Sequence, residues 1–153
     1  SREDEGHDRN GALRVALTCI DGRIHDALVA WTRHRLAVDV VDLVTVQGPD
    51  GGLAHGDGAW VARLVERVRV SQRAHGSTHL VIASHSDCAG HPVSDAQHRD
   101  DVASAVARLR PLLPGMGVVA AHISRTDGGW AVTEIPVKTA GAPSSGLPSE
   151  VAG

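Results

Sequence analysis

Short runs of β-branched and other apolar residues alternate along this chain with stretches whose apolar residues recur at helical spacing. The runs predict strands at residues 13–18, 38–46, 78–84, 117–123 and 130–135. The stretches predict helices over about 23–36, between Asp57 and Gly76, and between Ser94 and Pro111. Because strands that alternate with helices form mostly parallel sheets, we expect an α/β fold with helices on both faces. Right-handed crossovers favour the sheet order 2-1-3-4, with the fifth strand at an edge.

Residues typical of helix ends support these boundaries. Asp57 is suited to cap the second helix and Gly76 to end it, while Ser94-Asp-Ala-Gln97 reads as a capping box for the third. The segment from Gln47 to Asp57 carries four glycines and one proline, so we expect a loop there.

The length of 153 residues fits one domain. Residues 1–10 are mostly polar and predict a solvated N-terminal arm, and residues 138–153 are rich in Gly, Ser and Pro and predict a flexible C-terminal tail. The folded domain is therefore expected over residues 11–137. Three Trp stand beside no Phe and no Tyr, so the core must be built from aliphatic side chains.

The charge balance excludes several classes of partner. The net charge is −3 and no run of Lys or Arg occurs, which argues against nucleic acid and against an anionic membrane surface.

No apolar run is long enough to span a bilayer, and the polar start does not read as a signal peptide. Two cysteines are too few for a disulfide scaffold, so a cytoplasmic protein is expected.

The predicted strand order reverses between strands 1 and 3, where α/β sheets bind ligands at the carboxyl ends of the strands. Cys19 follows strand 1, and His85 and Cys88 follow strand 3, so the three side chains can converge. Two thiolates and one imidazole match a zinc site that leaves its fourth position to water or substrate. Two alternatives stay open here: cysteines buried as small apolar residues beside a loop histidine, or a Cys19–Cys88 disulfide.

Asp21 and Arg23 lie directly after Cys19. Asp21 could simply cap the first helix, with Arg23 as a solvent-exposed charge. Beside a zinc ion, Asp21 could instead accept a hydrogen bond from the bound water, and a bidentate Arg23 could hold that carboxylate in place. An unrestrained Asp21 could also occupy the fourth zinc position. The sequence motifs of zinc metalloproteases, nucleobase deaminases, P-loop proteins and α/β-hydrolases are absent.

The combination Cys19-x-Asp21-x-Arg23 and His85-x-x-Cys88 resembles the signature of β-class carbonic anhydrases, and most closely a short branch of that superfamily, over about residues 12–136. The resemblance implies reversible hydration of carbon dioxide to bicarbonate by a zinc-bound hydroxide. It also implies a small-molecule substrate and a homodimer or larger homo-oligomer. Hydrolysis of carbon disulfide or carbonyl sulfide at the same site is one alternative, and a zinc-bound binding or regulatory domain without activity is another.

Four features depart from the family pattern. Ala89 stands where the family has glycine after the second cysteine, and the N-terminal arm is short. The aromatic residues that commonly line the family's substrate pocket are Phe or Tyr, which this chain lacks. After strand 2, the sequence Gln47-Gly-Pro-Asp-Gly51 replaces a typical Arg-Asn-Ala-Gly-Asn segment. These departures concern the substrate pocket and the subunit interface.

Five further residues lie near the expected site. His91 could relay protons or face the pocket, and Asp87 could cap a backbone turn or take part in catalysis. His25 and Asp50 could approach the pocket, whereas His122 is expected to be a core histidine.

Overall fold

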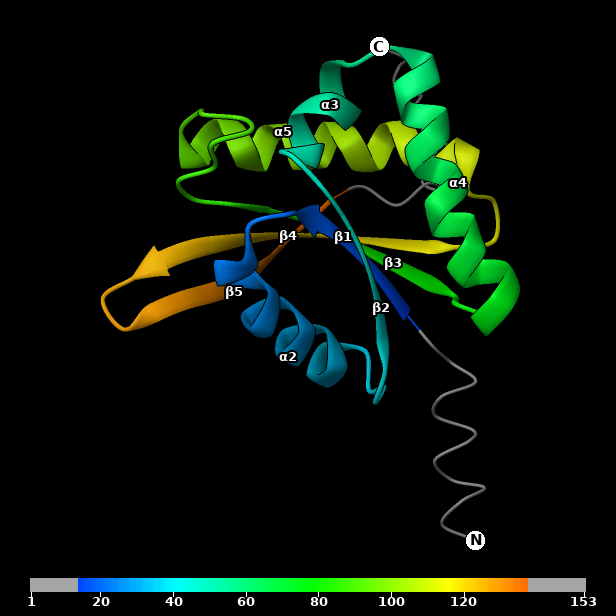
Figure 1. The fold of residues 1–153 in the computed structure, drawn as a ribbon, viewed down its shortest axis with the longest axis horizontal. Helices are drawn as coiled ribbons and strands as arrows, with labels where there is room; N and C mark the ends of the chain where they lie inside the picture. Colours follow the sequence, from blue (N-terminus) through cyan, green and yellow to red (C-terminus); the bar gives the residue numbers. More distant parts are fainter. Residues whose placement is uncertain (1–13, 138–153) are drawn as a thin grey trace, which may run out of the picture.

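The computed structural model describes residues 14–137, so the predicted arm at residues 1–10 and the predicted tail at residues 138–153 lie outside the described residues (Figure 1). The strands are β1 (Arg14–Cys19), β2 (Val41–Val46), β3 (His79–His85), β4 (Gly117–Thr126) and β5 (Gly129–Ile135). The α-helices are α2 (His25–Arg35), α3 (Pro49–His55), α4 (Gly58–His75) and α5 (Asp95–Leu109). Two short 3-10 helices are η1 (Gly22–Ile24) and η2 (Arg110–Leu112).

The five strands form one sheet in the order β2-β1-β3-β4-β5. The first four strands are parallel and β5 is antiparallel to β4, so the predicted strand order and the predicted edge strand are confirmed. Since β1 and β3 are hydrogen-bonded neighbours, Cys19 at the end of β1 and His85 at the end of β3 reach the same edge of the sheet.

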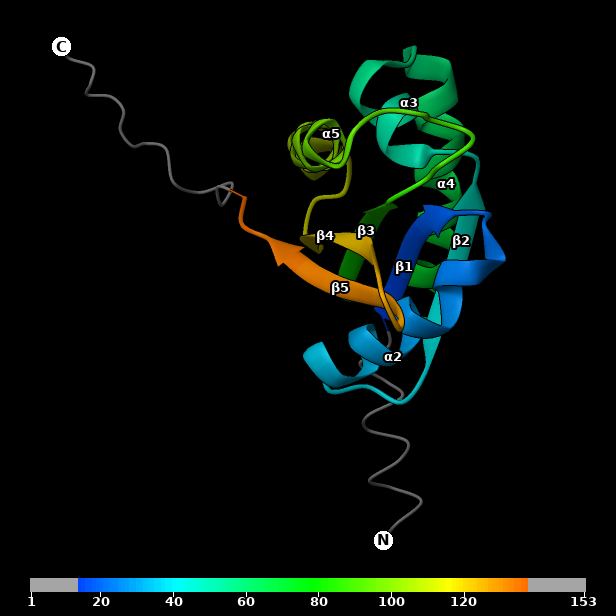
Figure 2. The ribbon, with the colours of Figure 1, turned by 90° about the vertical axis from the view of Figure 1, so that its left-hand side faces the viewer.

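Helices cover both faces of the sheet, with α2 on one face and α3, α4 and α5 on the other (Figures 1 and 2). The side chains of β1 alternate between these faces, as the pleat of a strand requires. Val15 and Leu17 join the cluster beneath α4 and α5, while Ala16 joins the smaller cluster with Ile24 and Leu28. The buried core is aliphatic, as the composition requires. Among the described residues, no helix combines the length and the apolar character needed to cross a membrane.

The predicted helix ends are confirmed with one change. The side chain of Asp57 accepts a hydrogen bond from the Trp60 amide at 2.9 Å, and Gly76 ends α4 in the left-handed region at φ 71°. Ser94 accepts from the Gln97 amide at 3.1 Å. The Gln97 side chain does not close the capping box, because its amide donates to Asp101 instead.

The loop predicted from Gln47 to Asp57 is wrong, because this segment contains the helix α3. Pro49 stands at the start of the helix, where proline is favourable. Close packing explains two glycines of α3. A Cβ on Gly51 would lie 2.6 Å from His91, and one on Gly52 would lie 2.4 Å from Trp60. Tertiary packing therefore compensates the low helix propensity of glycine. Strand β2 also begins at Val41, later than predicted.

Candidate metal centre

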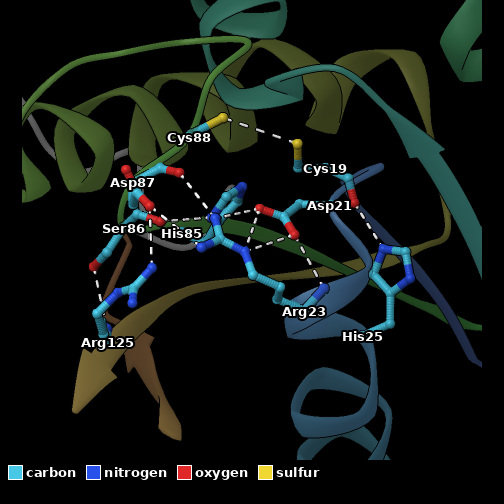
Figure 3. Close-up of polar contacts among 9 residues, drawn as sticks. All are labelled: Cys19, Asp21, Arg23, His25, His85, Ser86, Asp87, Cys88 and Arg125. Atoms are coloured by element: carbon cyan, nitrogen blue, oxygen red, sulfur yellow. Dashed lines mark hydrogen bonds and ion pairs between the residues drawn. The ribbon is translucent and has the colours of Figure 1, made fainter. Parts of the chain in front are cut away.

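The structure brings Cys19, His85 and Cys88 together, each as a buried side chain at the carboxyl edge of the sheet (Figure 3). One ligand atom from each residue lies within 4.8 Å of the others. The two Sγ atoms are 3.9 Å apart and both thiols are free. In a tetrahedral zinc site with Zn–S bonds of about 2.3 Å, the two sulfurs lie roughly 3.8 Å apart. The observed spacing therefore fits two zinc ligands and does not fit a disulfide.

The orientation of the His85 ring also suits a zinc ligand. Its Nδ1 donates to the backbone carbonyl of Ser86 at 2.7 Å, which fixes the tautomer that leaves the Nε2 lone pair free. That Nε2 atom is buried and has no hydrogen-bond partner among the described residues. Burial lowers the pKa of His85, so the imidazole is held in the neutral form that a metal ion requires.

The pKa of the Cys88 thiol shows that this site disfavours a thiolate in the absence of a cation. Burial, and then the neighbouring Cys19, raise the pKa of Cys88 to about 11. The backbone amides of His91 and Gly90 act in the opposite direction by donating to the Cys88 sulfur. A bound metal ion reverses this balance, because a coordinated thiol is deprotonated outright. The donor set therefore has the chemistry of a zinc centre.

Asp21 both caps a helix and is held by the guanidinium of Arg23, so the structure contains the two contacts that the sequence offered as alternatives. The Asp21 carboxylate accepts from the Arg23 amide at 3.0 Å, which caps η1. It also accepts from Nε of Arg23 at 3.0 and 3.1 Å and from Nη2 at 2.7 Å. The hydrogen bonds from the guanidinium lower the pKa of Asp21 to about 2. Asp21 is thus an ionised carboxylate with a fixed orientation.

Asp87 connects this pair to the loop that carries the cysteine ligand (Figure 3). Its carboxylate accepts from Nη1 of Arg23 at 3.3 Å and from Nη2 of Arg125 at 3.0 Å. Its backbone adopts φ 60°, an uncommon region that Asp tolerates better than most residues. The guanidinium groups of Arg23 and Arg125 both lie over the ring of Trp130, at 5.1 and 4.9 Å from its centroid. The Trp130 ring also meets His85 edge to face at 6.2 Å.

Sequence reasoning did not identify Arg125 and Trp130 as neighbours of the site. The two residues are directly paired in the β4–β5 ladder, which places both near the carboxyl end of β3. The available signal was the antiparallel hairpin itself, which returns the chain to the edge where the predicted ligands lie.

A pocket of about 340 Å³ opens beside the centre. It is lined by Cys19, Ile20, Asp21, Gln47, Ala89 and Gly90. The pocket thus contacts one candidate metal ligand, the fixed carboxylate and the side chains of Ile20 and Ala89. Gln47 was noted in the sequence only as part of the glycine-rich segment.

The other predicted residues lie around the centre without lining this pocket. Nε2 of His91 contacts Asp101 at 2.6 Å, and Nε2 of His25 contacts the backbone carbonyl of Cys19 at 2.8 Å. His122 is fully buried, with Nδ1 at 2.7 Å from the Ser84 hydroxyl, as expected of a core histidine. The remaining candidate, Asp50, is buried against His98 on α5.

Comparison with known proteins identifies the family. A family model with the description "Putative carbonic anhydrase" matches residues 9–136. The crystal structure of carbonic anhydrase from Streptococcus mutans resembles this fold with a TM-score of 0.53 and 20% identity, over 84% of this chain and 84% of that chain. The β-carbonic anhydrase CafA of Aspergillus fumigatus gives a TM-score of 0.49 and 11% identity, over 83% and 78% of the two chains. No curated protein sequence matches the chain. The matched region spans most of the chain, which therefore belongs to the carbonic anhydrase family that this model describes.

Proposed function

We propose that this protein catalyses the reversible hydration of carbon dioxide to bicarbonate and a proton. One observation carries the proposal: a buried Cys19–His85–Cys88 cluster stands next to a carboxylate that an arginine holds by two nitrogens, and both meet at one pocket. Family membership supports the same reaction class.

Cys19, His85 and Cys88 would hold one zinc ion through two Sγ atoms and Nε2. Zinc bound there would lower the pKa of a water molecule to about 7 and so supply a nucleophile at neutral pH. Three protein ligands leave one position for that water, as catalytic zinc sites require. The free Nε2 of His85 and the 3.9 Å separation of the sulfurs are the features that fit this role.

Asp21 would orient the attacking water by accepting a hydrogen bond from it. Because the pKa of Asp21 is about 2, the carboxylate stays an acceptor at every pH at which the enzyme would work. Arg23 is a positioning residue: its N–H groups contact both carboxylate oxygens and thereby keep Asp21 off the metal. Asp87 and Arg125 would hold Arg23 in turn.

The pocket suits a small apolar substrate. Ile20 and Ala89 offer apolar contacts to carbon dioxide, and the Gln47 side-chain amide can donate a hydrogen bond to one of its oxygens. The proton would leave to buffer through the open pocket. The relay predicted for His91 stays a prediction, because its Nε2 contacts Asp101.

Stopped-flow measurement of carbon dioxide hydration with a pH indicator tests the proposal on zinc-replete protein. We expect hydration well above the buffer rate, a strong loss in Asp21→Asn, and no change in the exposed Arg33→Ala control. A rate equal to that of buffer, in protein carrying one zinc per chain, would disprove the proposed substrate. Release of hydrogen sulfide from carbonyl sulfide in the same sample would then identify the sulfur-hydrolase alternative.

A further inference from the structure

A second group of potential ligands lies in the layer of α3 and α5, and the proposed reaction does not use it. One ligand atom from each of Asp50, His91 and His98 lies within 4.8 Å of the other two. Asp50 is 1% exposed and His98 is fully buried, while the side chain of His91 is 19% exposed. The three residues come from α3, from the loop after β3 and from α5, so they join three separate segments.

The contacts around these residues resemble the support that proteins give to metal-binding imidazoles. Nε2 of His91 lies 2.6 Å from Asp101, which fixes the tautomer of His91 and leaves Nδ1 as its free nitrogen. Nδ1 of His98 lies 2.6 Å from an oxygen of Asp50, so these two atoms can share one ion in place of the proton between them. Gly51 lies against Nδ1 of His91, where a Cβ would come within 2.6 Å. Because residue 51 is glycine, no side chain from this position of α3 fills the space beside Nδ1 of His91.

The buried carboxylates around His91 and His98 also favour a cation. Asp50 and Asp101 are both almost fully buried, at 1% and 2% exposure. Two buried carboxylates are costly unless cationic partners balance them. Asp101 already meets His55 at 3.0 Å and accepts a hydrogen bond from Gln97 at 2.9 Å. A divalent cation on His91 and His98 would balance Asp50 directly and add positive charge near Asp101 through the His91 ring. Two imidazoles and one carboxylate suit first-row divalent ions such as Zn²⁺, Fe²⁺ and Co²⁺.

We propose that Asp50, His91 and His98 form a second metal site that takes one first-row divalent ion and fastens the loop after β3 to α3 and α5. The site is separate from the Cys19–His85–Cys88 cluster and shares no ligand with it. It does not depend on the reaction with carbon dioxide. Binding requires the imidazole proton of His98 to move from Nδ1 to Nε2 and the Asp50–His98 contact to open slightly, since the ligand atoms of such sites stand farther apart than 2.6 Å.

Cobalt provides the test, because its absorption spectrum distinguishes thiolate ligands from nitrogen and oxygen ligands. Protein carrying one Zn²⁺ per chain is titrated with Co²⁺ while uptake is followed by metal analysis. We expect one further equivalent to bind, with visible bands of a nitrogen and oxygen ligand set and without thiolate charge-transfer absorption. The melting temperature should rise with Co²⁺ concentration, because the ion binds only the folded state.

Variants assign the second equivalent to the proposed ligands. Asp50→Asn and His91→Gln should each weaken Co²⁺ binding more than tenfold and keep the zinc, while Asp101→Asn should weaken it by about 10–100-fold. The control His34→Gln, exposed on α2, should bind as the wild type does. No further Co²⁺ uptake by the wild-type protein overturns the proposal whatever the variants do. Unchanged uptake in both ligand variants overturns it as well.

Discussion

In the Asp21–Arg23 pair, one side chain makes a local structural contact and is also the acceptor of the proposed reaction. The same carboxylate caps η1 and receives the guanidinium of Arg23, so the cap fixes the direction in which the carboxylate points. The motif Cys19-x-Asp21-x-Arg23 therefore brings the proposed ligand at the end of β1, the proposed acceptor and its positioning residue together within one short segment. This local geometry explains why the pairing could be predicted from the sequence.

Arg23→Ala should reduce carbon dioxide hydration by about 10–100-fold while zinc content stays close to one per chain. The loss would arise because Asp21, without its guanidinium, can turn toward the metal and no longer orient the water. Hydration rates and metal analysis of the same preparation measure both quantities, with Arg33→Ala as the matched control. Wild-type turnover of this variant would remove Arg23 from the mechanism, and wild-type turnover of Asp21→Asn as well would leave Asp21 as a helix cap alone.

The lowered pKa of Asp21 gives the stability of the protein a defined pH dependence. The pKa is about 2 in the folded state and about 3.9 in the unfolded chain, so ionised Asp21 stabilises the fold above that upper value. The contribution is lost as pH falls through 2. We expect Asp21→Asn to lower the free energy of unfolding by about 1 kcal/mol at pH 6, and by much less near pH 2. Urea unfolding at both pH values measures this difference, and the exposed Asp100→Asn should show no such pH dependence.

Contacts that join distant strands were harder to predict than the motif. Cys19 and His85 could be placed together because the sheet order follows from the alternation of strands and helices. Arg125 and Trp130 could not, since their approach to Arg23 depends on side-chain directions at the end of the β4–β5 hairpin. Periodicity reports which face of a strand a residue occupies, and it does not report which long side chains meet beyond the strand ends.

The helix α3 is the element where local propensity misled the prediction. Its glycines weaken a helix in isolation, yet His91 and Trp60 occupy the space that side chains on Gly51 and Gly52 would need. The partners of these glycines come from elsewhere in the chain, so no pattern within the segment reveals them. Gly51 therefore reflects close packing of α3 against the loop that carries Cys88, and Gly52 reflects close packing against α4.

Gly51→Ala should destabilise the protein by about 1–3 kcal/mol, because the added methyl group would overlap the His91 ring and push the loop after β3 outward. Gly58→Ala is the matched control in the next helix, since a Cβ there meets no atom within 4 Å. It should be neutral or stabilise by up to about 1 kcal/mol. Thermal unfolding of both variants measures the contrast. Equal stability of the two would show that the loop yields to the methyl group without cost.

The molecule as a whole exposes apolar side chains near one sheet edge. Leu43 on β2 is 36% exposed, Val40 before that strand is 44% exposed, and Ile20 after β1 is 61% exposed. The β2 strand pairs only with β1 among the described residues, so its other side presents unpaired backbone groups. Proteins generally cover such an edge, and a second copy of the chain is one way to do so.

We therefore predict a homodimer that buries the β2 edge. Sedimentation at micromolar concentration should give about twice the chain mass of 16.0 kDa. Leu43→Lys should shift the protein toward the monomer, because a charged side chain at the centre of the interface resists burial. Leu112→Lys is the control: Leu112 is 39% exposed on η2, which lies between α5 and β4 in the chain, and its replacement should leave the dimer intact. A wild-type species of 16.0 kDa would rule out the dimer, and a Leu43→Lys dimer of unchanged strength would place the interface elsewhere, with β5 as the next edge to test.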